Sequence, residues 1–522
     1  MQTALTTASQ IPARARDADA AAGILNRRWF AIAVILLAAV PLLWPELPPL
    51  TDLPGHVGRY RVMTADGTGP LSRFFTFEWR WVGNLGMDAM VAALASLLGL
   101  EPAVKATVIL IQCGSVAAIL ALSRQVHGRV TPFVLFAVPL VYNQPFHFGF
   151  LNYCMAMGLA LAGLSLWLRL GRQKRYRLRA ALAVPFSFLV WTAHIVGWGS
   201  LCLLAFGAAV AERADRREGM AERLIRAALS CFALAGPIVL MLLNAGSGGG
   251  TIERFFNLVI KARGLASIMR DQWIWVDLPS TLLVVLIVYA AVRGRLGRLH
   301  PVAAWMSGVM AAAVLAMPFM VMGSAYADVR LLPYAMIVAL VGIAPAPTDS
   351  DNRMRAYLLV GMAFCLIRLA ATTVSLIVVD QGWQRETGAI EALPRGARVM
   401  AMVARDCDEP WGVSRLIHLP GLAMARRDAF VNSQWPMLGA PLMRFRNPRP
   451  GYFDADPSQI VLRVRCPDLP ANMTQSQSLA TFPRERFTHL WLIRPHPVDP
   501  EQLRGMTLIW SNGDSKLFRI DR

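Results

Sequence analysis

One short segment, LTDLPGHVGRYR at residues 50–61, combines side chains that can exchange a proton and bind a phosphate. Asp52 and His56 are four residues apart, and Pro54 lies between them. If the residues after Pro54 are helical, His56 and Arg59 share one face, and Asp52 lies at the start of that helix. A carboxylate beside a histidine and arginines can take a proton from an acceptor while the guanidinium groups hold a phosphate. Asp52 and His56 are therefore candidate catalytic residues.

The same pattern has a purely structural interpretation. An aspartate just before a helix that starts with proline is a common N-cap, whose carboxylate accepts a hydrogen bond from the first turn. The local spacing favours the cap for Asp52, although one aspartate can serve both purposes.

Other polar side chains gather at the ends of apolar runs. Polar groups inside a bilayer are costly, and they are commonly functional. Their grouping predicts an outward-facing site at the membrane surface. Short turns need polar residues in any case, and a single histidine is more often structural than functional. The residues in question are Asn84, Asp88, His147, Asn152, Tyr153, His194, Arg263, Tyr326, Asp328 and Arg330.

The composition indicates what must position these residues. The chain has 522 residues, of which 55% are hydrophobic and only 16% charged, and its mean hydropathy is +0.44. Soluble chains carry about 25% charged residues. The chain is too apolar for a soluble enzyme, and it is neither disordered nor a disulfide scaffold. We expect a polytopic α-helical membrane protein.

Eleven apolar runs are candidate membrane spans. Several are shorter than the roughly 20 residues of an ideal span, so we expect tilted and broken helices. The runs lie near residues 29–44, 104–123, 130–143, 150–168, 180–195, 197–211, 225–243, 278–292, 301–322, 331–346 and 356–378.

The basic residues predict the orientation. The net charge of +19 would suggest nucleic acid in a soluble chain, but the excess lies between apolar runs, so no nucleic-acid partner is expected. If residues 84–100 lie flat as an amphipathic helix, one side holds 22 Lys and Arg and the other holds ten. If they span, the cluster at 169–179 is translocated, against the positive-inside rule. We therefore predict a cytoplasmic tail at 1–28, a transmembrane region at 29–379 and a first outer loop at 45–103.

Residues 380–522 have a different composition. They alternate short strand-like runs with Pro-rich turns, which predicts a small α/β or α+β domain on the outer, periplasmic face. Cys407 and Cys466 are either a disulfide of that oxidising compartment or two buried thiols. The expected strands are Val399–Val403, His489–Ile493, Thr507–Trp510 and Lys516–Ile520.

This layout resembles the GT-C superfamily of integral membrane glycosyltransferases, which use polyprenyl-phosphate sugars. The segment around Asp52 and His56 is similar to the D-x-P-x-H opening of a poorly characterised bacterial branch. Asn84 and Asp88, the FHFGFLNY turn at 146–153 and the DVRLLPYA segment at 328–335 are also similar to that group.

The resemblance implies a transferase in the bacterial inner membrane. Its donor is a polyprenyl-phosphate-linked sugar, and its acceptor is a glycan, a lipid or a protein. Asp52 matches the family's acidic residue that serves as catalytic base or metal-associated carboxylate, and His56 would orient or share the proton. No D-x-D pair follows the first helix, so a divalent metal lacks support, and no other cofactor is expected. The donor phosphate and lipid are assigned to Arg59, Arg263, Arg330 and His194, and the acceptor or cavity lining to Asn84, Asp88, His147, Asn152, Tyr153, Tyr326 and Asp328.

Two other functions remain open. A transporter or lipid flippase is favoured by the number of spans and by Arg368 in the middle of the last one, but no inverted repeat is visible. The lack of a D-x-D or D-E pair at Asp52 also allows a catalytically inactive assembly or receptor protein. Arg368 is expected to face the bundle interior, because a cation at the bilayer centre costs about 2.5–3.5 kcal/mol. A buried tether between helices is favoured there over a lipid-phosphate contact.

Overall fold

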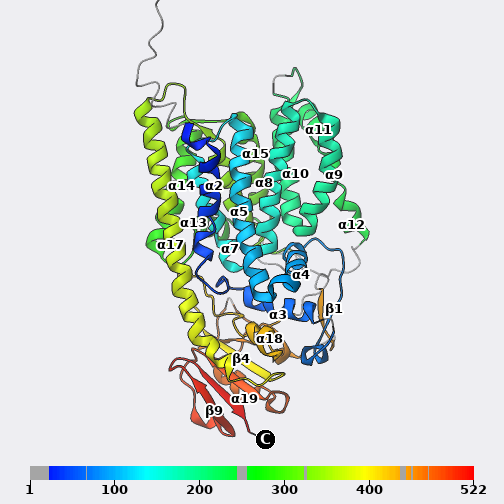
Figure 1. Cartoon of the computed structure of the whole chain (residues 1–522), viewed down its shortest axis with the longest axis vertical. Helices are drawn as coiled ribbons and strands as arrows, with labels where there is room; N and C mark the ends of the chain where they lie inside the picture. The colour runs from blue at the N-terminus through cyan, green and yellow to red at the C-terminus, as the bar shows by residue number, and fades with distance from the viewer. Residues whose placement is uncertain are drawn as a thin grey trace, which may run out of the picture.

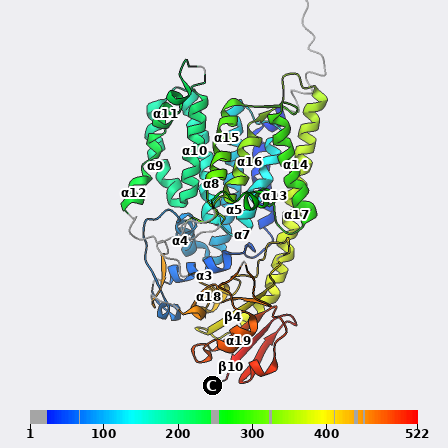
Figure 2. The ribbon, with the colours of Figure 1, turned by 180° about the vertical axis from the view of Figure 1, so that it is seen from behind.

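A computed structural model describes residues 23–521, except 66, 215, 244–254, 322–325, 409, 436–441, 448–450 and 468. The predicted class is confirmed: the chain is an α-helical polytopic membrane protein with a C-terminal sheet. The helices form a bundle, and the sheet lies at one end of it, as Figures 1 and 2 show from opposite sides. Residues 392–521 are called the sheet region below.

Four described helices are long and apolar enough to cross a membrane. They are α5 (Leu100–His127), α8 (Leu151–Arg172), α14 (Ile274–Val292) and α17 (Asp351–Glu391). Shorter apolar helices accompany them: α2 (Arg28–Leu37) with η1 (Val40–Leu42), α4 (Gly86–Leu98), α10 (Ile195–Ala211), α15 (Pro301–Ala316), and η6 (Val329–Leu331) with α16 (Leu332–Val341).

The expected breaks in the spans are present. The run near 225–243 is divided into α11 (Met220–Ser230), η4 (Phe232–Leu234) and α12 (Pro237–Leu243). The run near 130–143 consists of α6 (Val134–Ala137) and η3 (Val138–Tyr142). Proline at the start of a piece lacks the N–H that would continue the preceding helix. The remaining bundle helices are α7 (Gln144–Phe148), α9 (Tyr176–Ala193) and α13 (Leu258–Ala266).

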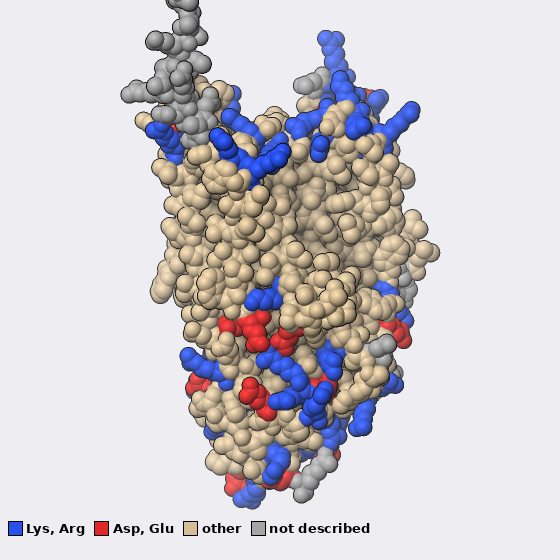
Figure 3. Space-filling model, viewed as in Figure 1, with Lys and Arg blue, Asp and Glu red and all other residues tan. Residues whose placement is uncertain are grey.

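Charge is segregated along the bundle. Figure 3 shows Lys and Arg gathered at the end far from the sheet region, an apolar belt in the middle, and both signs of charge toward the sheet region. The predicted topology requires the basic loops to lie together at one end of the bundle, as they do here (Figure 3). A short strand pair, β2 (Arg298–Leu299) with β3 (Ile343–Ala344), joins the segment between α14 and α15 to the segment between α16 and α17. That the basic end faces the cytoplasm stays a prediction.

The first loop lies at the opposite end of the bundle. It contains α3 (Leu53–Thr64), η2 (Pro70–Arg73), β1 (Phe75–Phe77) and α4. Helix α3 lies beside the sheet region, and α4 lies between α3 and the bundle (Figures 1 and 2). Helix α4 has 13 residues, or about 20 Å of helix, against the roughly 30 Å of a hydrocarbon core. Gly99, with φ of +82°, separates it from α5. Residues 84–100 thus form no full-length span.

The sheet region is built around β4 (Arg398–Arg405), whose middle residues are buried. Strand β4 pairs in parallel with β5, β7 and β8, and β8 continues through antiparallel β10 to β9. All four predicted strands are confirmed. The bounds are β5 (Phe430–Val431), β7 (Ile460–Leu462), β8 (His489–Ile493), β9 (Met506–Ser511) and β10 (Lys516–Ile520), with helices α18 (Gly421–Arg427), η7 (Tyr452–Asp454), α19 (Gln475–Thr481), η8 (Arg484–Arg486) and η9 (Pro500–Leu503).

The first loop and the sheet region are joined directly. Strand β1 pairs antiparallel with β6 (Met443–Phe445). The Asp428 carboxylate lies 2.7 Å from Arg61 and 2.6 Å from Arg395. Helix α3 also packs closely on α18, because a Cβ at Gly421 would lie 2.6 Å from the Pro54 carbonyl oxygen. These contacts make one wall of the site out of two distant parts of the chain.

Helix α17 crosses the predicted domain boundary without a break. The last span was expected near 356–378 and the outer domain from 380, yet the helix continues to Glu391. The bundle and the sheet region are therefore connected by one continuous helix, visible in Figure 1 along the edge of the molecule.

The prediction for Arg368 is confirmed. Its side chain is 2% exposed, and one guanidinium nitrogen lies 2.8 Å from the Asp277 carboxylate of α14. A second nitrogen donates to the Met269 carbonyl at 3.1 Å. Asp277 also accepts from the indole N–H of Trp411 at 2.8 Å. Arg368 is thus a buried tether between α17, α14 and the sheet region, and the pair requires no lipid phosphate.

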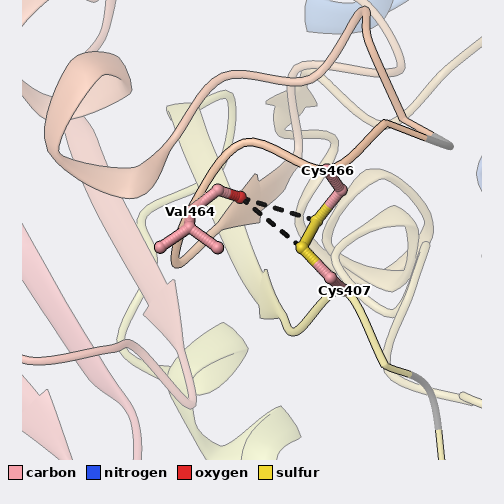
Figure 4. Close-up of a disulfide and its surroundings, with 3 residues drawn as sticks. All are labelled: Cys407, Val464 and Cys466. Carbon is pink, nitrogen blue, oxygen red and sulfur yellow. Dashed lines mark hydrogen bonds between the residues drawn. A yellow bond between two sulfur atoms is a disulfide. The ribbon is translucent and has the colours of Figure 1, made fainter.

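Cys407 and Cys466 form a disulfide, which decides between the two open alternatives. Figure 4 shows the bridge beside the Val464 carbonyl, whose oxygen lies 3.5 Å from Cys466 Sγ and 3.8 Å from Cys407 Sγ. The bridge connects the end of β4 to the segment after β7.

Candidate active site

A cavity of about 460 Å³ lies where the bundle meets the sheet region. Its bundle side is formed by the start of α3, the turn before α8, the junction of α9 and α10, and η6. Its other side is formed by residues 413–418 and Trp435 of the sheet region. Eight residues expected from the sequence line it: Asp52, His56, Asn84, Asn152, Tyr153, His194, Tyr326 and Arg330.

Asp52 occupies the N-cap position of α3, but its side chain accepts no capping hydrogen bond. The capping interpretation of its carboxylate is therefore wrong. The Asp52 amide instead donates to the Phe148 carbonyl at 3.0 Å, and the Thr51 amide donates to the His147 carbonyl at 3.2 Å. The 146–153 turn thus holds the Asp52 backbone while the carboxylate points into the cavity, where its side chain stays 20% exposed.

Gly149 makes that backbone contact possible. Its φ is +93°, a conformation that costs other residues about 1–2 kcal/mol. A Cβ there would also lie 3.1 Å from the Asp52 amide nitrogen and 3.2 Å from the Asp52 Cβ. The FHFG turn therefore requires glycine both for its conformation and for its distance from Asp52.

Burial sets the protonation of Asp52. Removal from water raises the pKa of this carboxyl from 3.8 to about 7; the positive charge of Arg330 opposes the rise, and the negative charge of Asp456 adds to it. A base with a pKa near neutral pH is well matched to accept a proton from a hydroxyl.

His56 lies on the same side of the cavity, one helical turn after Asp52. Its ring is 5.3 Å from that of Trp435 and 6.3 Å from that of Tyr60. Burial lowers its pKa well below 6.5, and the charges of Arg59 and His418 act in the same direction. Its Nδ1 is buried and has no hydrogen-bond partner among the described residues. His56 is therefore a neutral ring with one unused nitrogen.

Cations outnumber carboxylates around the cavity. Arg330, Arg270 and Arg405 line it, and Asp52 is the one carboxylate among its described lining residues. The Arg330 guanidinium is buried and lies 3.9 Å above the Phe150 ring. Arg270 bonds the Trp411 carbonyl at 2.6 Å. Such a positive cavity suits an anionic ligand, and guanidinium groups bind phosphate oxygens well.

The amide and aromatic lining is itself well connected. Asn152 donates to the Asn84 carbonyl at 3.0 Å and accepts from the Met87 amide. His194 accepts from the Val196 amide at 3.1 Å, so its Nδ1 caps α10. The Tyr153 hydroxyl donates to the Arg330 carbonyl. These bonds fix the walls of the cavity around Asp52.

The structure places five of the sequence candidates outside the cavity. Arg59 pairs with buried Asp88 at 3.0 Å, and Asp328 pairs with Lys261 at 2.8 Å. The remaining two are His147 and Arg263. His147 is fully buried against Arg415 and Asp271, and Arg263 is exposed on α13. Four of the five thus hold the scaffold through ionic or hydrogen-bonded contacts.

The sheet region supplies cavity-lining residues that sequence reasoning missed. His418 lies with its Nε2 3.8 Å from Asp52 Oδ1. The Trp435 ring lies 4.4 Å from the His418 ring and 5.3 Å from the His56 ring. Arg405 and Ser414 complete that wall. No local pattern marks these residues, because their proximity to Asp52 results from the tertiary fold alone.

No metal-binding cluster is present in the described ranges, which contain no group of three or more His, Cys, Asp or Glu side chains arranged around one point.

Comparisons with known proteins place the chain near one set of solved structures. No protein-family model matches it, and no match to a curated protein was found. Its fold is similar to the crystal structure of ArnT from Cupriavidus metallidurans in the apo state, with a TM-score of 0.49 and 12% identity over 94% of this chain and 97% of that one. The structure of the same ArnT bound to undecaprenyl phosphate gives a TM-score of 0.48 and 13% identity over the same shares. ArnT is a GT-C glycosyltransferase.

Proposed function

We propose that this protein is a membrane glycosyltransferase that transfers a sugar from a polyprenyl-phosphate donor to an acceptor hydroxyl outside the cytoplasm. The observation that carries the proposal is the uncapped Asp52 carboxylate, which faces a cavity with three arginines at the outer end of an apolar bundle. A base and a phosphate-binding group in one site are what this transfer needs.

The reaction uses Asp52 as general base. Asp52 takes the proton from the acceptor hydroxyl as that oxygen bonds to the anomeric carbon of the sugar. The bond from the anomeric carbon to the phosphate oxygen breaks, and polyprenyl phosphate leaves with the electron pair. A well-placed general base contributes about 10²- to 10⁴-fold to such a step.

Arg330 is the residue best placed to hold the phosphate. It is buried, its charge acts on Asp52, and its guanidinium carbon lies 3.9 Å from the centre of the Phe150 ring. Arg405 and Arg270 add positive charge on the sheet-region side. Phe148, Phe150 and Leu151 give the cavity an apolar wall against which the first isoprene units can pack.

The orientation follows from the positive-inside rule. The basic end of the bundle faces the cytoplasm, and the sheet region and the cavity face the periplasm. The disulfide agrees with that side, since an oxidising compartment lets it persist. We retain 29–379 as the transmembrane region, with α17 continuing past its end.

The test is transfer by purified protein in lipid nanodiscs, supplied with polyprenyl-phosphate-linked sugars and candidate acceptors. Wild-type protein and D514N, which changes an exposed aspartate far from the cavity, should release polyprenyl phosphate at the same rate. D52N should bind donor but fail to transfer. Transfer by D52N at the wild-type rate would remove Asp52 from the mechanism.

A further inference from the structure

His418 is held in an unusual way beside the cavity. It belongs to the sheet region, in the turn before α18, and it is 5% exposed. Its φ is +65°, in the left-handed region that few residues other than glycine occupy. Its ring lies 4.4 Å from that of Trp435. Residues kept in sparsely populated conformations concentrate at functional sites.

The hydrogen bonds of Gln459 fix the ring's proton. The Gln459 Oε1 accepts from the His418 amide at 3.3 Å, and its Nε2 donates to Asp456 Oδ1 at 2.8 Å. The same Nε2 lies 2.6 Å from His418 Nδ1. A reversed amide would place its oxygen against the Asp456 carboxylate and its N–H against the His418 amide. Nδ1 also lies 3.3 Å from the Ser433 carbonyl, an acceptor that would need a proton on Nδ1, but the contact with Gln459 Nε2 is the shorter of the two at 2.6 Å. We therefore assign Nδ1 as the acceptor, and in the neutral ring the proton resides on Nε2.

That proton faces Asp52. His418 Nε2 and Asp52 Oδ1 are 3.8 Å apart, about 1 Å longer than a formed hydrogen bond. Catalytic hydrogen bonds are commonly long without substrate and tighten in the reacting complex. Burial lowers the pKa of His418 below 6.5, against the opposing charge of Asp456, so the ring is neutral at neutral pH.

We propose that His418 is a positioning residue, whose Nε2–H donates to Asp52 Oδ1 and leaves Oδ2 to accept the proton of the acceptor. Gln459 and Asp456 keep the histidine in the required tautomer. The inference rests on the proposed function, and it makes the site incomplete without the sheet region. The other groups that face Asp52 are His56 from α3 and Arg330 from η6, with Asp456 behind His418.

Two substitutions separate this role from a structural one. H418N keeps an acceptor for Gln459 and tolerates a positive φ, but it does not reach Asp52. H418Q can extend an amide N–H toward Asp52. We expect kcat to fall 10- to 100-fold in H418N and less in H418Q, with little change in the KM of the donor. H489Q, which changes a buried histidine of β8 away from the cavity, is the matched control.

The direction in which the pH profile moves distinguishes a positioning role of His418 from a structural one. A donated hydrogen bond stabilises the Asp52 carboxylate, so its loss raises the pKa of Asp52. The acidic limb of kcat/KM should therefore move to higher pH in H418N, and back toward the wild-type position in H418Q. A structural defect alone lowers the amount of active protein and leaves the limb in place. An unmoved limb or an unchanged kcat in H418N would overturn the proposal.

A second measurement needs no turnover. Nitrogen-15 NMR of full-length protein with labelled histidine reports the tautomer, and the spectrum of H418N assigns the His418 signals. Protonated Nε2 with unprotonated Nδ1 supports the inference, whereas the reverse tautomer overturns it. If wild-type protein transfers no sugar, the proposed function fails, while this spectrum still decides the geometry of His418.

Discussion

Asp52 and His418 lie in separate parts of the chain, and their facing atoms are 3.8 Å apart across the junction of the bundle and the sheet region. Asp52 is held by the turn before α8, and His418 by Gln459 of the sheet region. The chemistry of the cavity therefore depends on how these two parts are held together.

The pH dependence of transfer follows from the pKa of Asp52. Because burial raises this pKa to about 7, the base is ionised above pH 7 and protonated below it. We expect kcat/KM to rise with pH through about 7 and then to level. The measurement is a pH profile at subsaturating donor, and a profile that is flat between pH 5.5 and 8.5 would contradict the assignment.

The raised pKa of Asp52 also affects folding stability, which should fall with rising pH while activity rises. Asp52 holds its proton more tightly when folded than when unfolded, so folding loses stability as pH rises from about 4 to about 7. D52N removes the ionisation without removing a capping bond. We expect D52N to be more stable than wild type by about 1–3 kcal/mol at pH 8, and equal to it at pH 4. Thermal unfolding at both values tests this difference.

Gly149→Ala should impair both folding and catalysis. The alanine would have to adopt the positive φ of Gly149, and its Cβ would lie against the Asp52 backbone. We therefore expect folding stability to fall by about 1–2 kcal/mol, together with a lower kcat. Gly128→Ala is the control, since Gly128 has φ of +73° but no atom within 4 Å of its added Cβ. G128A should lose stability while its folded fraction keeps the wild-type kcat. Equal kcat in both variants would show that the turn does not position Asp52.

Removing one member of the Arg368–Asp277 pair should destabilise the bundle strongly. Leaving a buried charge without its partner costs about 3–5 kcal/mol. R368M and D277N should each unfold at much lower temperature in detergent, and the double variant should recover part of the loss. A double variant as unstable as the sum of the singles would show that the two side chains do not interact.

Removal of the disulfide should act on the sheet region. C407S/C466S opens a link between residues 59 apart in the sequence, for which chain entropy predicts a loss of about 4 kcal/mol. Limited proteolysis of the sheet region should accelerate, while the bundle stays folded. C154S, which changes a buried free cysteine of α8, is the comparison that leaves the sheet region intact.

The sequence predicts the bundle side of the cavity better than the other side. Polar residues at the ends of apolar runs must lie at one level of the bundle, which is why Asp52, Arg330 and His194 were identified. The same rule does not distinguish a ligand-facing residue from a paired one. Two ion pairs show this: Arg59 pairs with Asp88, and Asp328 pairs with Lys261, so these side chains do not line the cavity.

The sheet-region wall could not be predicted at all. His418 and Trp435 lie in irregular segments, and their approach to α3 depends on close packing at Gly55 and Gly421. The partner of Arg368 was missed for a related reason: Asp277 lies inside the first turn of α14, which was expected to begin only at residue 278. An ion pair between two helices produces no periodic pattern in the sequence of either helix, so the partner cannot be predicted from it.

Helix α17 sets a fixed distance between the membrane-spanning bundle and the sheet region. Its 41 residues extend about 60 Å, roughly twice the thickness of a hydrocarbon core. Each residue inserted between Val379 and Glu391 would lift the sheet region by about 1.5 Å and rotate it by about 100°. The sheet region is also held by α3 and by the Trp411–Asp277 contact, so an inserted residue would set the register of α17 against these contacts and displace His418 relative to Asp52.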